Sequence, residues 1–131
     1  RPRETWRDYF VQYYRYARGD GKADLWRKRH AIRYITYWVA GPALLWLTLA
    51  VHPTIGLLLL AGLAVYTRRP YARLPHVMRR YAERATVMPL DWLRAALMIP
   101  LIRVVGDVAK MIGYPVGWRW RLRENPPDWR V

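Results

Sequence analysis

The sequence contains no cysteine and few acidic residues, nine Asp and Glu against 23 Lys and Arg. The lack of cysteine excludes a disulfide framework and a thiolate metal site. Most of the basic residues are arginines, which give the chain a formal net charge of +14. Because the guanidinium group pairs bidentately with phosphate and carboxylate oxygens, this composition predicts anionic partners.

Charged residues are also missing from one long internal window. No Asp, Glu, Lys or Arg occurs between Tyr34 and Tyr66. A helix of a water-soluble domain needs a polar face, so a window of this length is typical of a membrane protein. A single helix over the window would be about 50 Å long at ~1.5 Å per residue. The hydrocarbon core of a bilayer is only ~30 Å thick, which favours two shorter helices.

The centre of the window reads VHPTIG and predicts a turn, because Pro53 lacks an amide donor. We therefore expect an all-α, membrane-associated fold with a transmembrane helical hairpin over residues 34–67, flanked by interfacial amphipathic helices. The hairpin limbs are Tyr34–Val51 and Thr54–Tyr66, and His52 lies in water at the turn. Arginines on both flanks predict a multi-pass protein of the inner (plasma) membrane with both ends cytoplasmic.

Residues 1–33 are expected to contain an amphipathic interfacial helix and a linker helix. Residues 5–18 place aromatic side chains at helical spacing, with Thr5 as the N-terminal cap and Gly19 at the C-terminal end. A helix rich in aromatic residues and arginine is typical of a membrane interface. The linker helix is expected over Ala23–Ile35.

Residues 68–131 are expected to form a cytoplasmic loop, an interfacial amphipathic helix and a basic tail. Prolines break the polar stretch 70–89, which leaves a short helix over His76–Ala85. A longer helix is expected over Asp91–Ile112, with ion pairs among Arg103, Asp107 and Lys110 and an apolar side of valine, methionine and isoleucine. The tail that follows, with alternating tryptophan and arginine, is expected to be extended or loosely anchored.

The order of these segments resembles the C-terminal part of membrane-bound family-2 glycosyltransferases. The resemblance is carried by WRDYFVQYYRYARGDGKADLWRKRH (Trp6–His30), by the hairpin, and by LIRVVGDVAKMIGYPVGWRWRL (Leu101–Leu122). It implies an enzyme that transfers a sugar from a nucleotide-sugar donor to an acceptor at the cytoplasmic membrane face. A lipid-linked acceptor would suit such a site.

The same resemblance implies a site for donor and acceptor at Gln12, Arg15, Tyr16 and Arg18. Gln12, Arg15 and Tyr16 occupy the positions of the family's Q-x-x-R-W motif, with tyrosine in place of tryptophan. An arginine can hold phosphate oxygens, an amide can bind hydroxyl groups, and an aromatic face can pack on a sugar ring. The tyrosine departs from the motif of processive members and favours a non-polymerising enzyme.

No catalytic residue and no metal site is expected within this chain. In the family, a D-x-D motif holds a divalent metal, Mg²⁺ or Mn²⁺, in an N-terminal GT-A catalytic domain, and no D-x-D occurs here. Asp20 and Asp24 are four residues apart and read more simply as a loop and a helix cap. The chain begins at Arg1, which we interpret as the start of a piece of a longer protein whose catalytic domain is a partner of this region.

Two alternatives remain open at the level of sequence. The first is a small non-enzymatic membrane protein or adaptor whose basic faces bind anionic lipid headgroups or a partner protein. The second is a nucleic-acid-binding protein, given the interleaved arginine and aromatic residues. We expect no nucleic acid partner, because that hypothesis leaves the charge-free window unexplained.

Overall fold

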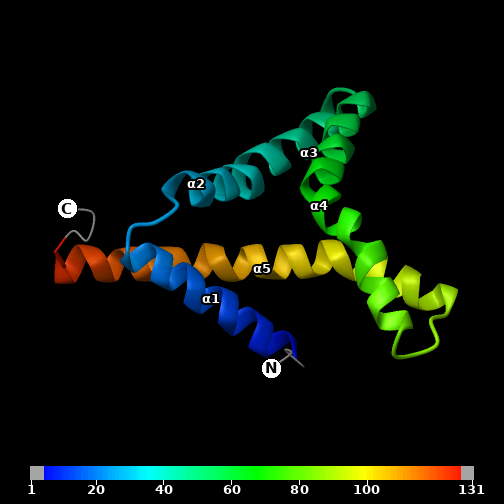
Figure 1. Ribbon diagram of the computed structural model, residues 1–131. Coiled ribbons are helices and arrows are strands. Elements are labelled where there is room, and N and C mark those ends of the chain that lie inside the picture. The colour runs from blue at the N-terminus through cyan, green and yellow to red at the C-terminus, as the bar shows by residue number, and fades with distance from the viewer. Residues whose placement is uncertain (1–4, 128–131) are drawn as a thin grey trace. The chain divides into compact units, whose positions relative to one another are not determined.

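The computed structural model describes residues 5–127, and within them the chain is helical with no strand (Figure 1). This confirms the predicted all-α class. The elements, in order, are α1 (Trp6–Lys22), α2 (Arg27–Ile35), the π-helix η1 (Thr36–Ala40), α3 (Gly41–Ala50), the 3₁₀-helix η2 (Pro53–Ile55), α4 (Gly56–Ala82) and α5 (Pro89–Glu124).

The described residues divide into two compact units. The first contains residues 5–40 and 104–127, and therefore α1, α2, η1 and the C-terminal part of α5. The second contains residues 41–103, with α3, η2, α4 and the N-terminal part of α5. The division of the sequence into residues 1–33, 34–67 and 68–131 remains a prediction, and its residues 1–4 and 128–131 lie outside the described chain.

The first helix begins where the sequence predicts and ends later. Thr5 caps α1 by accepting a hydrogen bond from the Asp8 amide, as expected. The expected end at Gly19 is wrong, because α1 continues to Lys22 before the chain turns. The expected start of the next helix at Ala23 is also wrong. Asp24 and Trp26 have φ of 55° and 57°, left-handed values that postpone α2 to Arg27.

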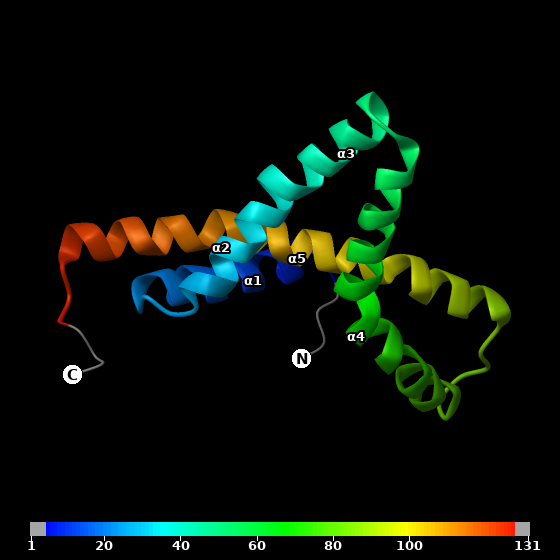
Figure 2. The same cartoon turned by 90° about the horizontal axis from the view of Figure 1, so that it is seen from above.

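Glycines bring α1 into direct backbone contact with α5 in the first unit (Figures 1 and 2). A Cβ atom at Gly113 would overlap the carbonyl oxygen of Tyr14, and one at Gly117 would overlap that of Arg18. Gly21 has the reciprocal relation to the carbonyl of Tyr114. Such stripes of small residues let two helices approach more closely than larger side chains permit.

The face of α5 that packs in the first unit therefore differs from the expected one. Its buried residues are Gly106, Ala109, Gly113 and Gly117. The sequence pattern instead predicted an apolar side of larger residues, of which Val104 and Ile112 are exposed. Helical periodicity finds large apolar side chains, and it does not register a contact surface made of glycine.

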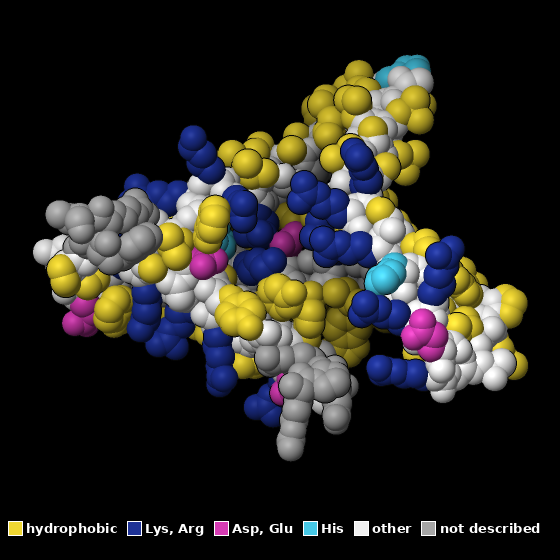
Figure 3. Space-filling view, in the orientation of Figure 1, with side chains coloured by type: hydrophobic (Ala, Val, Ile, Leu, Met, Phe, Trp, Pro, Cys, Tyr) yellow, Lys and Arg dark blue, Asp and Glu magenta, His cyan; other side chains and the backbone are white. Residues whose placement is uncertain are grey.

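In the second unit, α3 and α4 form a helical hairpin around the predicted turn. His52 caps η2 by accepting from the Thr54 amide at 3.3 Å, and its side chain is exposed as expected. A Cβ at Gly56 would lie 3.0 Å from the Thr48 methyl group, so this glycine lets the two helices approach at the turn. Yellow hydrophobic side chains cover the hairpin in Figure 3.

The helices of the hairpin do not support the predicted crossing of the bilayer. No helix among the described residues combines the length and the apolar character needed to cross a membrane. The predictions of a transmembrane hairpin over residues 34–67 and of a multi-pass inner-membrane protein with both ends cytoplasmic are therefore wrong. The reason is local: α3 has ten residues, and α4 carries Arg68 and Arg69 within its length.

Prolines do not break the helices as expected. The stretch 70–89 was predicted to be a broken loop with a separate helix over His76–Ala85, whereas α4 runs through Pro70 and Pro75. In the same way α5 passes Pro100 and Pro115 and ends at Glu124 rather than at Ile112. The prediction of an extended or loose tail is therefore wrong for its described part up to Glu124. Regular structure stops only before Pro126 and Pro127.

Three interior prolines each leave one carbonyl oxygen of their own helix without a backbone donor, and a side chain of another helix donates a hydrogen bond to that oxygen. Proline has no N–H for the carbonyl four residues earlier, so that oxygen loses its helical partner. The freed oxygens and their donors form three pairs: for Pro70, Tyr66 O with Arg103 Nη2 at 2.8 Å; for Pro100, Ala96 O with the Tyr71 hydroxyl at 3.0 Å; and for Pro115, Met111 O with the Tyr34 hydroxyl at 2.5 Å. These bonds satisfy the acceptors and join helices.

We expect Tyr34→Phe to lower the free energy of unfolding of the full chain by about 1–3 kcal/mol, because the Met111 carbonyl loses its donor. In a Pro115→Ala background, the new N–H of residue 115 can donate to the Met111 carbonyl. Tyr34→Phe should then lower the free energy of unfolding much less. Denaturant unfolding of the four proteins of this cycle measures the difference. Tyr81→Phe, at an exposed tyrosine of α4, is the control. Equal costs in both backgrounds would contradict the assignment.

Candidate functional site

The four residues predicted to bind donor and acceptor lie on α1. Gln12 Nε2 donates to the Tyr16 hydroxyl at 2.7 Å, which joins the two residues on one side of the helix. Tyr16 is 58% exposed, and Arg15 and Arg18 are exposed as well. At 100° per residue, Arg15 lies on the same side as Gln12 and Tyr16, and Arg18 lies further round.

A row of aromatic rings extends along α1 to this group. Tyr9 and Tyr13 have ring centroids 4.6 Å apart, and Tyr13 meets Tyr16 edge-on at 6.2 Å. Lys110 of α5 lies over the Tyr13 ring with its Nζ 4.7 Å from the centroid. Tyr16 is thus held by a hydrogen bond on one side and a ring contact on the other, while most of its surface stays open.

The opposite side of α1 is fixed by the helix contact with α5. Ala17 is fully buried, and Gly21 is buried where a Cβ would overlap the Tyr114 carbonyl. The sequence pattern predicted that the apolar face of this helix lies at the membrane interface, whereas in the structure α5 contributes to the surface that covers Ala17 and Gly21. The polar side with Gln12 and Arg15 is therefore presented from a helix supported by backbone contact.

A partly buried polar network joins α1, α2 and α5 beside this support. His30 is 3% exposed and stacks on the Tyr114 ring at 3.9 Å. Its Nε2 lies 3.3 Å from Asp20 Oδ2, and its Nδ1 lies 3.1 Å from Arg33 Nη1. Arg33 continues the chain by donating from Nε to Asp107 Oδ1 at 2.8 Å.

The contacts of His30 indicate which nitrogen carries the proton when the ring is neutral. A guanidinium group has donors only, so His30 Nδ1 accepts from Arg33 and carries no proton. The proton of the neutral ring is then on Nε2, which donates to Asp20. Burial lowers the pKa of His30, opposed in part by the hydrogen bond to Asp20 and reinforced by the charges of Arg33 and Lys110.

Sequence reasoning missed this network except for one pair. The predicted pairing of Asp107 with Lys110 is present at 3.8 Å. The longer links, from Asp20 to His30 and from Arg33 to Asp107, join residues 10 and 74 positions apart. Helical spacing relates residues three or four apart, so it gives no signal for such pairs.

The acidic residues of this region are engaged by basic side chains. Asp20 contacts His30, and Asp24 forms a bidentate pair with Arg27, with Arg27 Nη2 2.6 Å from Asp24 Oδ2. Over residues 5–127, no group of three His, Cys, Asp or Glu side chains is arranged to hold a metal ion. The chemistry supported by the exposed side of α1 is the binding of anions and hydroxyl groups.

Comparisons with models of known protein families, with curated proteins and with solved structures give no match for this chain.

We expect the first unit to lose stability as the pH falls below the ordinary histidine range. The folded protein holds His30 at a pKa below 6.5, whereas the unfolded chain titrates near ~6.5. The unfolded state therefore binds the proton first, and the free energy of unfolding decreases from pH ~6.5 down to the pKa of the folded state. Above pH ~6.5 this contribution is fully present.

Unfolding of the full chain followed from pH 8 to 5 measures this slope. His30→Gln should reduce the slope, because the variant has no titrating ring at this position. His52→Gln, at the exposed turn, is the matched control and should leave the slope unchanged. A wild-type slope that survives His30→Gln would contradict the assignment to His30.

Proposed function

We propose that this chain is the membrane-attached part of a glycosyltransferase that transfers a sugar from a nucleotide-sugar donor to an acceptor at a membrane surface. The observation that carries the proposal is the open Q-x-x-R-Y side of α1, with Gln12, Arg15 and Tyr16 together on a helix that α5 supports from behind. An anchoring helix has no need of a glutamine that orients a tyrosine hydroxyl. A helix that binds sugar and phosphate groups does.

The side chains of this surface suit the two ends of a nucleotide sugar. Among the described residues, neither Arg15 nor Arg18 has a carboxylate within ion-pair distance, so their guanidinium groups can donate to diphosphate oxygens. The Tyr16 ring can pack on a sugar. The Gln12 amide, whose nitrogen binds Tyr16, keeps its carbonyl oxygen for a sugar hydroxyl.

The transfer step itself belongs to a catalytic domain outside this chain. A glycosyltransferase of this kind uses a divalent metal, Mg²⁺ or Mn²⁺, to neutralise the donor diphosphate. The described residues do not fit that metal, because Asp20 contacts His30 and Asp24 pairs with Arg27. What this chain contributes is a binding surface beside the catalytic centre and attachment of the enzyme to lipid.

Attachment is proposed to occur through one leaflet without crossing it. Residues 34–66 carry no charge, and the hairpin exposes large apolar side chains such as Leu49, which is 80% exposed. Exposed apolar surface of this extent marks an interaction site. The apolar part of α4, from Gly56 to Tyr66, is about 16 Å long at ~1.5 Å per residue, roughly half of a ~30 Å hydrocarbon core.

Arginines follow this apolar segment and favour an anionic leaflet. Arg68, Arg69 and Arg73 lie in α4 directly after it. Each basic residue near an anionic surface contributes ~1 kcal/mol to binding. Anionic headgroups are therefore the proposed lipid partner.

The same arginines support a second candidate function, a non-enzymatic adaptor that binds anionic lipid or a partner protein. This candidate makes no use of Gln12 and Tyr16. The reading frame upstream of Arg1 distinguishes the two: alternating strands and helices with a D-x-D motif support the glycosyltransferase. A stop codon immediately upstream supports the adaptor.

In the enzyme that contains this chain, we expect Arg15→Ala to lower sugar transfer about 10- to 100-fold, the loss of one or two charge-assisted hydrogen bonds to phosphate. Sedimentation with membranes should be unchanged. Arg7→Ala removes an exposed arginine from another side of α1 and is the matched control. Full activity of the Arg15 variant would return this residue to a role in anchoring.

We expect Leu49→Glu to reduce binding of the chain to vesicles that contain phosphatidylglycerol by at least tenfold, because a carboxylate would enter the hydrocarbon region. Val77→Glu makes the same kind of change at an exposed position of α4 among charged residues, and should have little effect. Flotation of both variants with vesicles measures binding. Equal loss in the two variants would contradict insertion of the hairpin.

A further inference from the structure

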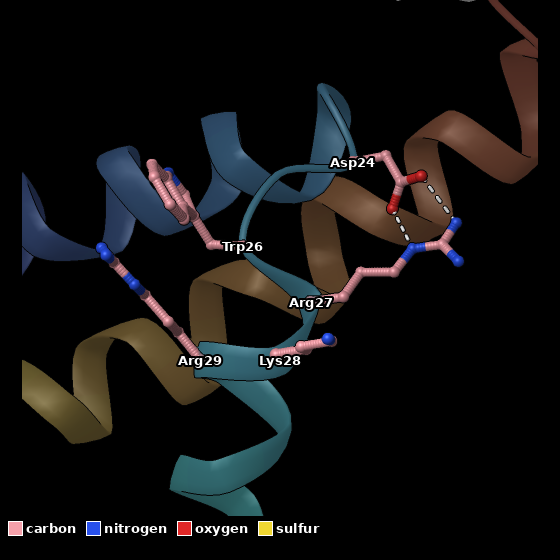
Figure 4. Close-up of a pocket in the computed structure, with 5 residues that line it drawn as sticks. All are labelled: Asp24, Trp26, Arg27, Lys28 and Arg29. Carbon is pink, nitrogen blue, oxygen red and sulfur yellow. Dashed lines mark hydrogen bonds and ion pairs between the residues drawn. The ribbon is translucent and has the colours of Figure 1, made fainter.

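A separate cavity lies at the turn between α1 and α2 in the first unit. It has a volume of about 430 Å³ and is lined by Asp24, Trp26, Arg27, Lys28 and Arg29 (Figure 4). None of these residues belongs to the predicted site on α1. We propose that this cavity binds a phosphate ester, with the phosphate on Lys28 and Arg29 and the ester substituent on Trp26.

The charge of the cavity favours an anion. Of its three basic side chains, Arg27 is already paired with the buried carboxylate of Asp24. Lys28 and Arg29 have no carboxylate within ion-pair distance among the described residues. The cavity therefore carries two positive charges without an internal counter-ion, and Asp24 is neutralised by its own partner.

The position of Arg29 suits phosphate in particular. Its guanidinium carbon lies 4.0 Å from the centroid of the Trp26 ring, and Figure 4 shows the two side chains next to each other. A cation–π contact uses the flat face of the guanidinium group. The N–H donors lie in its plane, so they remain free to form two parallel hydrogen bonds with phosphate oxygens.

Trp26 explains why the ligand should be an ester rather than a bare ion. Trp26 is 53% exposed, and its backbone has a φ of 57°. A left-handed conformation is unfavourable for a large side chain and persists only where the surrounding structure imposes it. The exposed ring gives the cavity an apolar wall on which a glycerol, sugar or acyl-bearing substituent can lie.

Two sources of this chemistry are a phospholipid headgroup and a soluble phosphate ester. Glycerol 3-phosphate and inorganic pyrophosphate serve as soluble probes in calorimetric titration of the full chain. Vesicles of phosphatidylcholine with or without phosphatidic acid serve as the lipid probe. Saturable binding of glycerol 3-phosphate, tighter than that of pyrophosphate, identifies a soluble ester, and binding only to phosphatidic acid vesicles identifies a headgroup. Either result supports the proposal if it depends on this cavity.

The decisive variant is the double substitution Lys28→Gln and Arg29→Gln, called the cavity pair. We expect at least tenfold weaker binding of the responding probe, the loss of charge-assisted hydrogen bonds. Arg79→Gln with Arg80→Gln removes the same charge at exposed positions of α4 in the second unit and is the matched control, with affinity for the soluble probes unchanged. With vesicles, the cavity pair should lower binding selectively for phosphatidic acid relative to phosphatidylglycerol, whereas the control pair should show no such selectivity.

Two further variants separate binding from folding. Arg29→Lys keeps the charge and should still weaken binding, because the planar donors are lost. Trp26→Ala should weaken glycerol 3-phosphate more than pyrophosphate, and circular dichroism verifies that helix content is kept. The proposal is overturned if no probe binds, or if the cavity pair and the control pair lose affinity equally. None of these measurements depends on sugar transfer. The proposed glycosyltransferase function can therefore be wrong while the phosphate-ester site is correct, and the reverse.

Discussion

This small helical protein depends on the carbonyl oxygens that stand four residues before its interior prolines. Because proline has no N–H, each of these oxygens lacks the partner that it would have in a regular helix. Such an oxygen is unsatisfied within its own helix, so it needs an outside donor if water is excluded. The hydroxyls of Tyr34 and Tyr71 and the guanidinium of Arg103 supply three of them. Each bond satisfies the freed oxygen and joins the helix that contains the proline to another helix. The loss of a hydrogen bond within one helix thus leads to a hydrogen bond between two helices.

Glycine has the complementary role in the first unit. Where α1 meets α5, no side chain separates the two backbones at Gly113 and Gly117, so the contact is short and its register is fixed. The network of His30 and Arg33 then joins α2 to the same pair of helices. Few large apolar residues are buried, so the unit relies on backbone proximity and satisfied polar groups more than on a hydrophobic core. The open polar side of α1 is a consequence of this arrangement.

Local signals in the sequence predicted part of this fold. The cap at Thr5, the turn at His52 and the lack of charge over residues 34–66 were readable because each depends on neighbours in the sequence. The hydrogen bond between Gln12 and Tyr16 was not predicted, although the two residues are four positions apart in the helix. Their role toward a nucleotide sugar remains a prediction.

The remaining features depend on residues far apart in the sequence. Pro70 reads locally as a helix breaker, and Pro115 lies in the part predicted to be a loose tail. The side chains that donate to the carbonyl oxygens freed by these prolines are 37 and 77 positions away from those oxygens. Gly117 was likewise predicted to lie in a loose tail, because its backbone contact with Arg18 of α1 joins residues far apart in the sequence. The error about the bilayer has another cause. The uncharged window was long enough in total, but the turn and Arg68 divide it into helices that are too short.

The buried network around His30 has a consequence for the way the protein responds to ionic strength. With the ring neutral, Asp20 and Asp107 balance Arg33 and Lys110, so this cluster has no net charge. Its partly sheltered pairs are screened weakly by dissolved ions, whereas the exposed arginines are screened within a Debye length of ~8 Å at physiological salt. Concentrated salt should therefore weaken the attraction of the exposed arginines for any anion while the helices of the first unit stay assembled, so that surface electrostatics and folding respond differently to the same solvent.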